Sequence, residues 1–191
     1  VNPDSGYSYS WFNFSEDPLS QVMSEMIGYP VCVDNDTRAM TYGEFMKGKA
    51  KSYKNVLFVN ASWGIGLGMI LDGKIYLGKS GFAGEFGHIH FYDNQVICHC
   101  GKKGCLETEA SGQAVCRKLI ERVKKGEISV LSEDIKAGKD ISLEKIVESA
   151  NNEDILCIEL IEEVGIELGK AIAGLINIFN PEAIVVGGML S

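Results

Sequence analysis

A cluster of cysteines and histidines in a glycine-rich segment constrains this 191-residue chain more than any other feature. The segment from residue 78 to residue 105 contains all three histidines and three of the six cysteines. The spacing follows the pattern His-x9-Cys-x-Cys-x4-Cys, formed by His88, Cys98, Cys100 and Cys105. Three thiolates and one imidazole make a closed tetrahedral ligand set for structural Zn²⁺, which would tie down a loop that cannot build its own core. We therefore expect zinc as a structural cofactor.

The expected zinc loop covers residues 84–107, and its ligand set leaves alternatives open. The cysteines could instead be free thiols in a cytosolic protein. His90 and His99 are competing donors. If residues 87–91 are extended, His88 and His90 share one face, so the spacing alone does not choose between them.

Hydrophobic spacing predicts a chain of mixed helices and strands. Helices are predicted over residues 19–27, from about residue 37 to 47, and over residues 154–179. Residues 110–125 and 127–150 are predicted to form two or three surface helices. Strands are predicted over residues 31–33, 56–61, 64–71, 74–77 and 183–186, of which those from 56 to 77 form a β-meander. Asp72-Gly73 lies between two apolar runs and predicts a tight hairpin turn, because both residues tolerate positive φ.

The charge balance excludes some classes of protein. The chain has 18 Lys and Arg against 26 Asp and Glu, a net charge of −8, which offers no basic surface for nucleic acid. Its most apolar long segment, residues 155–179, is interrupted by four Glu and one Lys, so we expect a soluble helix and no membrane contact. Residues 1–4 show no signal peptide and suggest a cut within a longer protein, so we expect a cytoplasmic protein.

Glycines follow two of the predicted strands. Gly64, Gly66 and Gly68 come after the strand that begins at residue 56, and Gly187 and Gly188 come after the last predicted strand. Such glycines let backbone amides approach a phosphate closely, so we predict a phosphate or nucleotide loop here. The alternative is that the first three glycines admit close packing or a bulge in a strand.

A set of polar residues lies at the ends of elements or beside glycines: Asn35, Asp36, Glu85, His88 and Glu107. Carboxylates and an amide match the hydroxyl groups of a sugar. An Asp in a cleft can also accept a proton from a hydroxyl during phosphoryl transfer. Taken one at a time, each of these residues could equally be a helix cap or a surface charge.

Together these motifs closely resemble the ROK family of sugar kinases and sugar-responsive transcriptional repressors. The resemblance is carried by residues 34–36, 43–44, 64–68, 81–88, 98–107 and 180–188. It implies an α/β fold of two actin-like, hexokinase-like lobes of the ribonuclease H type, with the sugar between them. Residues 1–50 would then be the end of an incomplete first lobe, and residues 51–191 most of the second lobe with the zinc loop.

The resemblance also implies roles for the residues singled out above. Asn35, Asp36, Glu85, His88 and Glu107 would contact the sugar. Asp36 would stand where the kinases of the family keep their general base. The zinc ligands would be His88, Cys98, Cys100 and Cys105, and His90 is set aside only by analogy.

Two departures from the kinases of the family decide between functions. An Asp-x-Gly-Gly-Thr phosphate loop is absent from residues 1–35, and Trp63 stands where the kinases commonly have a threonine. We therefore expect the sugar-sensing effector domain of a regulator, which binds a hexose or amino-sugar derivative, forms a homodimer and reaches DNA through an upstream helix-turn-helix. The alternative is an ATP-dependent hexose or N-acylhexosamine kinase with Mg-ATP and Asp36 as its base. A third possibility is a protein of the family that only dimerises.

Overall fold

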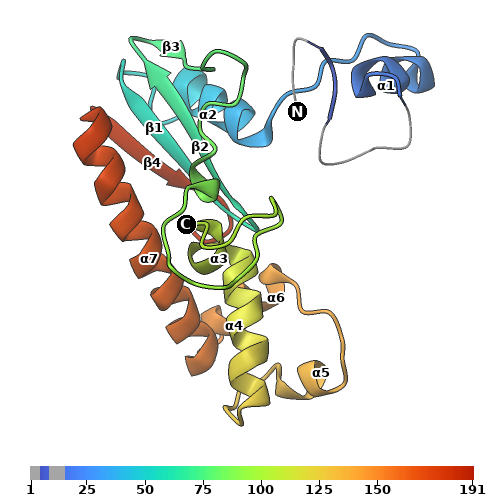
Figure 1. Cartoon of the computed structure of the whole chain (residues 1–191), viewed down its shortest axis with the longest axis vertical. Helices are drawn as coiled ribbons and strands as arrows, with labels where there is room; N and C mark the ends of the chain where they lie inside the picture. Colours follow the sequence, from blue (N-terminus) through green and yellow to red (C-terminus); the bar gives the residue numbers. More distant parts are fainter. Residues whose placement is uncertain (1–4, 9–15) are drawn as a thin grey trace.

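Short apolar segments build one mixed sheet, which lies at the opposite end of the molecule from the helices between residues 112 and 151 (Figure 1). The computed structural model describes residues 5–8 and 16–191. The strands are β1 (Val56–Ala61), β2 (Ile65–Leu71), β3 (Lys74–Ile75) and β4 (Ala183–Gly187), in the order β3-β2-β1-β4. β1 pairs antiparallel with β2 and parallel with β4, and β2 pairs antiparallel with β3. The predicted α/β class is confirmed.

The hairpin between β2 and β3 turns at the predicted dipeptide. Asp72 has φ 51° and Gly73 has φ 74°, the two positive values that a tight hairpin turn requires. β3 is shorter than the predicted strand over residues 74–77, because its ladder contains only the pairs Ile70–Ile75 and Leu71–Lys74. The hairpin prediction is confirmed and the length of its last strand is corrected.

The long helix α7 (Ile155–Phe179) joins two hydrophobic cores. The Asp154 side chain accepts a hydrogen bond from the Cys157 N–H at its start, and Asn180 at φ 43° ends it before Pro181. One apolar stripe is buried along its length: Leu156, Leu160, Val164, Leu168, Ala171 and Leu175. Of the helices in the described parts of the chain, none combines the length and apolarity needed to cross a bilayer.

The first core lies between the C-terminal half of α7 and one face of the sheet. It contains Leu57 and Val59 of β1, Leu67 and Met69 of β2, and Leu175 of α7. The second core lies at the other end of α7 (Figure 1). There α7 packs with α4 (Gly112–Lys124), α5 (Ser132–Lys136) and α6 (Leu143–Asn151). The two or three surface helices predicted over residues 110–125 and 127–150 are therefore three: α4, α5 and α6.

Helix α2 (Asp36–Lys47) covers the opposite face of the sheet. The buried Thr37 and Thr41 face β2, where they meet Gly66 and Gly68. A Cβ atom on Gly66 would lie 2.8 Å from the Cβ of Thr37, and one on Gly68 would lie 2.7 Å from the Cβ of Thr41. Of the two interpretations of these glycines, close packing describes what the structure shows at these two positions.

Two expectations near the N-terminus have different outcomes. Helix α1 (Leu19–Ile27) ends at Gly28 with φ 77°, as predicted, and lies apart from the sheet (Figure 1). The strand predicted over residues 31–33 is wrong, because this segment has no strand partner among the described residues and the Val31 N–H donates to Ser24 Oγ instead.

Two further expectations concern segments that the structure does not describe in full. The expected cut at residues 1–4 lies outside the described residues, and so does part of the expected first-lobe segment 1–50. The division into lobes at residue 50 stays a prediction. β4 is only partly buried, with Val186 43% exposed, because β4 is an outer strand of the sheet as described.

Candidate functional site

The N-terminus of α2 presents two of the predicted site residues. The Asn35 side chain accepts a hydrogen bond from the Arg38 N–H at 3.0 Å and thereby caps the helix. Asp36 Oδ1 accepts the N–H of Thr37 at 2.6 Å. Arg38 donates to Asp34 and to the carbonyl oxygen of Gly81, so it ties the start of α2 to the glycine-rich loop.

Glu107 is the most enclosed of the five predicted sugar contacts, with only 4% of its surface exposed. It lies at the start of α3 (Glu107–Ala110) and its Oε2 accepts the N–H of Ile65 at 2.9 Å. Its Oε1 lies 2.9 Å from His99 Nδ1. A Cβ atom on Gly64 would approach Oε2 to 2.5 Å, so only glycine at this turn leaves room for the carboxylate.

The four predicted metal ligands come together in space. Their ligand atoms on His88, Cys98, Cys100 and Cys105 all lie within 4.8 Å of one another. His88 Nδ1 is 3.5 Å from Cys98 Sγ, and Cys100 Sγ is 3.6 Å from Cys105 Sγ. Tetrahedral zinc, with bonds of about 2.3 Å to sulfur and 2.0–2.1 Å to nitrogen, separates S and N by about 3.6 Å and two S atoms by about 3.8 Å. The cluster could therefore hold a metal ion of this kind.

The structure distinguishes the three histidines that spacing left open. Phe86–His88 form a 3-10 turn, so His88 and His90 do not share a face as they would in an extended segment. His90 Nδ1 lies 3.2 Å from the Lys103 carbonyl oxygen, and His90 is not part of the cluster. His99 belongs to a second group with His88 and Glu107 on the cleft side.

Two of the three thiols in the metal cluster have a raised pKa. Burial raises the pKa of Cys98 to about 12 and is also the largest cause of the raised pKa of Cys105. Burial acts in the same direction on Cys100, but hydrogen bonds from the Lys102 backbone and from the neighbouring thiols outweigh it and lower its pKa. A metal cation must displace protons from the buried thiols, so its affinity falls as the pH falls.

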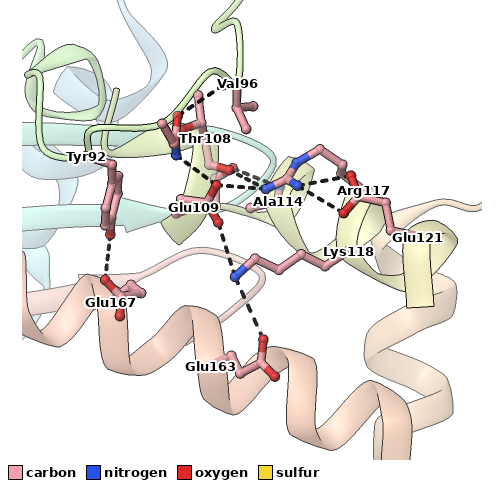
Figure 2. Close-up of polar contacts among 12 residues, drawn as sticks. Tyr92, Val96, Thr108, Glu109, Ala114, Arg117, Lys118, Glu121, Glu163 and Glu167 are labelled. Atoms are coloured by element: carbon pink, nitrogen blue, oxygen red, sulfur yellow. Dashed lines mark hydrogen bonds and ion pairs between the residues drawn. The ribbon is translucent and has the colours of Figure 1, made fainter. Parts of the chain in front are cut away.

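The loop between His88 and Cys98 is fixed to the helices by polar contacts (Figure 2). The Tyr92 hydroxyl donates to Glu167 Oε2 on α7 at 2.8 Å, and Asn94 Nδ2 donates to Glu109 Oε1 on α3 at 3.0 Å. Arg117 of α4 donates to the same Glu109 oxygen at 3.1 Å. These contacts attach the metal-ligand loop to α7 and α3, and Arg117 in turn links α3 to α4.

A cleft of about 970 Å³ lies between the start of α2, the β1–β2 turn and the metal-ligand cluster. Its size falls within the range of small-molecule sites. All five predicted sugar contacts line it: Asn35, Asp36, Glu85, His88 and Glu107. Gly64, Gly66 and Gly68 line it as well, whereas Gly187 and Gly188 do not.

The cleft also includes residues that the sequence did not single out as site residues. Thr37, Arg38, Asn60 and Gln113 line it together with Trp63, whose departure from the kinase pattern was visible in the sequence. Asn60 had a signal, because it is the one polar residue in the apolar strand VLFVNA. An amide in a fully buried strand needs hydrogen-bond partners, so such a residue can be singled out from the sequence.

Comparisons with known proteins agree with the resemblance. The ROK family model matches residues 4–191. The glucokinase of Halalkalibacterium halodurans is 34% identical over 194 residues, which cover 100% of this chain and 59% of the relative. The DNA-binding transcriptional dual regulator NagC of Escherichia coli strain K12 is 34% identical over 193 residues, which cover 100% of this chain and 46% of the regulator.

Solved structures share the fold. The ROK family glucokinase from Streptomyces griseus, in complex with glucose and AMPPNP, superimposes with a TM-score of 0.84 at 29% identity. The match covers 98% of this chain and 62% of that one. The chain therefore spans roughly half the length of the curated relatives it matches, and these include both enzymes and regulators.

Proposed function

Since the chain belongs to the ROK family, we propose that it is the sugar-sensing part of a transcriptional regulator, with a hexose or amino-sugar derivative bound in the cleft. One observation carries this proposal: a single cleft brings together Asn35, Asp36, Glu85, His88 and Glu107. Three carboxylates, an amide and an imidazole are hydrogen-bonding partners for the hydroxyl groups of a sugar. Glu107 is fixed by Ile65 and His99, so its acceptors are preorganised.

Trp63 supports a regulator over a kinase. It lies in the β1–β2 turn, lines the cleft and is 53% exposed. The kinases of the family commonly place a small threonine in this turn. We propose that the bulky indole reshapes the pocket that would otherwise take a nucleotide phosphate.

We further propose that the cluster of His88, Cys98, Cys100 and Cys105 binds Zn²⁺ in a structural role. With Nδ1 facing Cys98, the other ring nitrogen of His88 lies 3.8 Å from Glu85 Oε2. A metal on Nδ1 would hold the ring in this orientation, as outer groups commonly orient the ligands of metal sites. The metal site would thus support two of the sugar contacts.

The proposed regulator has a wider organisation that follows from the resemblance. Residues 1–50 would end the first lobe and residues 51–191 would form most of the second. Sugar binding would shift an equilibrium between open and closed lobes, to the extent that the two states differ in affinity. In a homodimer this shift would change the placement of DNA-binding domains that lie upstream.

An ATP-dependent hexose or N-acylhexosamine kinase is the second candidate. The observation in its favour is that Asp36 lines the cleft while the bonds that hold its carboxylate fall on Oδ1. Asp36 could then accept a proton from a sugar hydroxyl, with Mg-ATP as the phosphoryl donor. The 34% identity to a glucokinase also supports this candidate.

Thermal unfolding with a panel of hexoses and N-acetylhexosamines tests the proposed function in the intact protein. A ligand at 100 times its Kd stabilises the folded state by about 2.7 kcal/mol, so the binding sugar raises the Tm. Asp36→Asn is expected to reduce that shift, because it removes a charged acceptor from the cleft. Glu121→Gln on the outer side of α4 is the control and should keep the full shift. If no sugar in the panel shifts the Tm, the proposal is contradicted.

A further inference from the structure

A chain of four hydrogen bonds leads from the loop after β4 to the carboxylate of Asp36. The Met189 N–H donates to Ser62 Oγ at 3.3 Å, and the Ser62 hydroxyl donates to Asn60 Oδ1 at 2.9 Å. Asn60 Nδ2 donates to Thr37 Oγ1 at 3.1 Å, and the Thr37 hydroxyl donates to Asp36 Oδ1 at 3.3 Å. The chain connects β4, β1 and α2 across one face of the sheet.

Every bond in this chain is oriented toward the carboxylate. Each hydroxyl donates once toward Asp36 and accepts once from the other side, and Asn60 uses both ends of its amide. Bonds aligned in this way polarise one another, most strongly in an environment of low dielectric constant. Asn60 is 5% exposed and Thr37 is 4% exposed, so the middle of the chain is shielded from water.

The chain also fixes one oxygen of the Asp36 carboxylate. Oδ1 accepts from both the N–H and the hydroxyl of Thr37. Within residues 5–8 and 16–191, no group bonds to Oδ2, which leaves this oxygen for a ligand in the cleft that Asp36 lines. A ligand that bonds to Oδ2 is therefore expected to alter the hydrogen bonds at Oδ1 and along the hydrogen-bond chain.

The far end of the hydrogen-bond chain, in the segment after β4, packs against the end of β1. Gly188 has φ 106°, and a Cβ atom there would lie 2.7 Å from Asn60 Oδ1. The Leu190 N–H donates to the Ala61 carbonyl oxygen at 2.9 Å. The position of the Asn60 amide therefore bears directly on the packing of residues 188–190.

We propose that Asn60 is a positioning residue that couples the Asp36 carboxylate to the segment 188–190 after β4. A ligand hydroxyl bound to Asp36 would alter the chain of bonds and so the local stability of that segment. This inference rests on the proposed function in taking a sugar as the ligand. It would connect sugar binding at Asp36 to the stability of the segment 188–190 across the sheet. The coupling itself exists in the absence of ligand and is tested there first.

Amide hydrogen exchange of the ligand-free, intact protein tests the coupling. Asn60→Ala removes the centre of the chain, and the isosteric Thr37→Val removes one link without leaving a cavity. Both are expected to speed the exchange of the Met189 amide at least twofold. Thr41→Val is the matched control, because Thr41 is equally buried one turn along α2 and its hydroxyl donates to the Thr37 carbonyl oxygen of its own helix. Equal Met189 exchange in Thr37→Val and Thr41→Val would overturn the proposal.

A second measurement separates this proposal from the proposed function. A sugar that raises the Tm is expected to change exchange over residues 187–191 in the parent protein and in Thr41→Val, but not in Thr37→Val. If the ligand-free effect of Thr37→Val is observed and no sugar binds, the coupling is supported and the proposed function fails. If a sugar binds and exchange at residues 187–191 is the same in all variants, the coupling fails and the proposed function stands.

Discussion

Replacing Gly68 by alanine tests why glycines alternate along β2. The new Cβ would lie 2.7 Å from the Cβ of Thr41 and closer still to its hydroxyl, in a region where Thr41 is 1% exposed. Overpacking of this kind costs about 1–3 kcal/mol, because backbone or side chains must shift. We expect Gly68→Ala to lower the free energy of unfolding by about 2 kcal/mol. For a chain of this size that is a fall in Tm of about 4–8 °C.

Urea unfolding measures this effect, with the midpoint lowered and the slope unchanged. Gly43→Ala is the matched control, because Gly43 lies on the exposed side of α2 and a Cβ there would meet nothing within 4 Å. That variant should gain about 0.5–1 kcal/mol from the better helix propensity of alanine. The double variant Gly68→Ala with Thr41→Ala should recover part of the loss. Effects of the same sign and size at Gly68 and Gly43 would refute the close-packing argument.

Three further predictions concern the metal cluster, a buried cap and the cleft. Cys100→Ser should lower the metal content of the purified protein and its Tm, whereas Cys32→Ser, at an exposed position outside the cluster, should change neither. Burial raises the pKa of Asp154, but hydrogen bonds from two backbone amides and the Ser129 hydroxyl outweigh it and lower the pKa below its usual value. The stability that Asp154 contributes is therefore complete above its unfolded pKa of about 3.9 and is lost as the pH falls through its folded pKa. Asp154→Asn should be less stable at neutral pH, and unfolding measured against pH should show the difference shrinking below about pH 4. Glu107→Gln should weaken sugar binding at least tenfold by calorimetry, because an amide cannot accept at both of its ends.

Much of the fold could be predicted from local pattern. The apolar stripe of α7 and the Asp72-Gly73 turn depend on nearby residues and were predicted correctly. The strand expected over residues 31–33 was wrong, because a strand needs a partner that an apolar triplet does not reveal.

The candidate site was predictable in part. The cluster of three cysteines and a histidine could be assembled from spacing, but the choice of His88 over His90 depends on the 3-10 turn at residues 86–88. The close packing of Gly66 and Gly68 could not be predicted without knowing that the threonines of α2 lie opposite them, and the phosphate loop stays a prediction. The role of Asn60 was missed because its partner Thr37 lies 23 residues away on α2.

The most direct test of the central claim is ADP release by the intact protein with Mg-ATP and the sugar panel, measured beside the thermal shift. We predict that a hexose or amino sugar raises the Tm, that Glu107→Gln reduces the shift, and that no ADP is released above the background without sugar. Sugar-dependent ADP release that is lost in Asp36→Asn would contradict this account and identify a kinase.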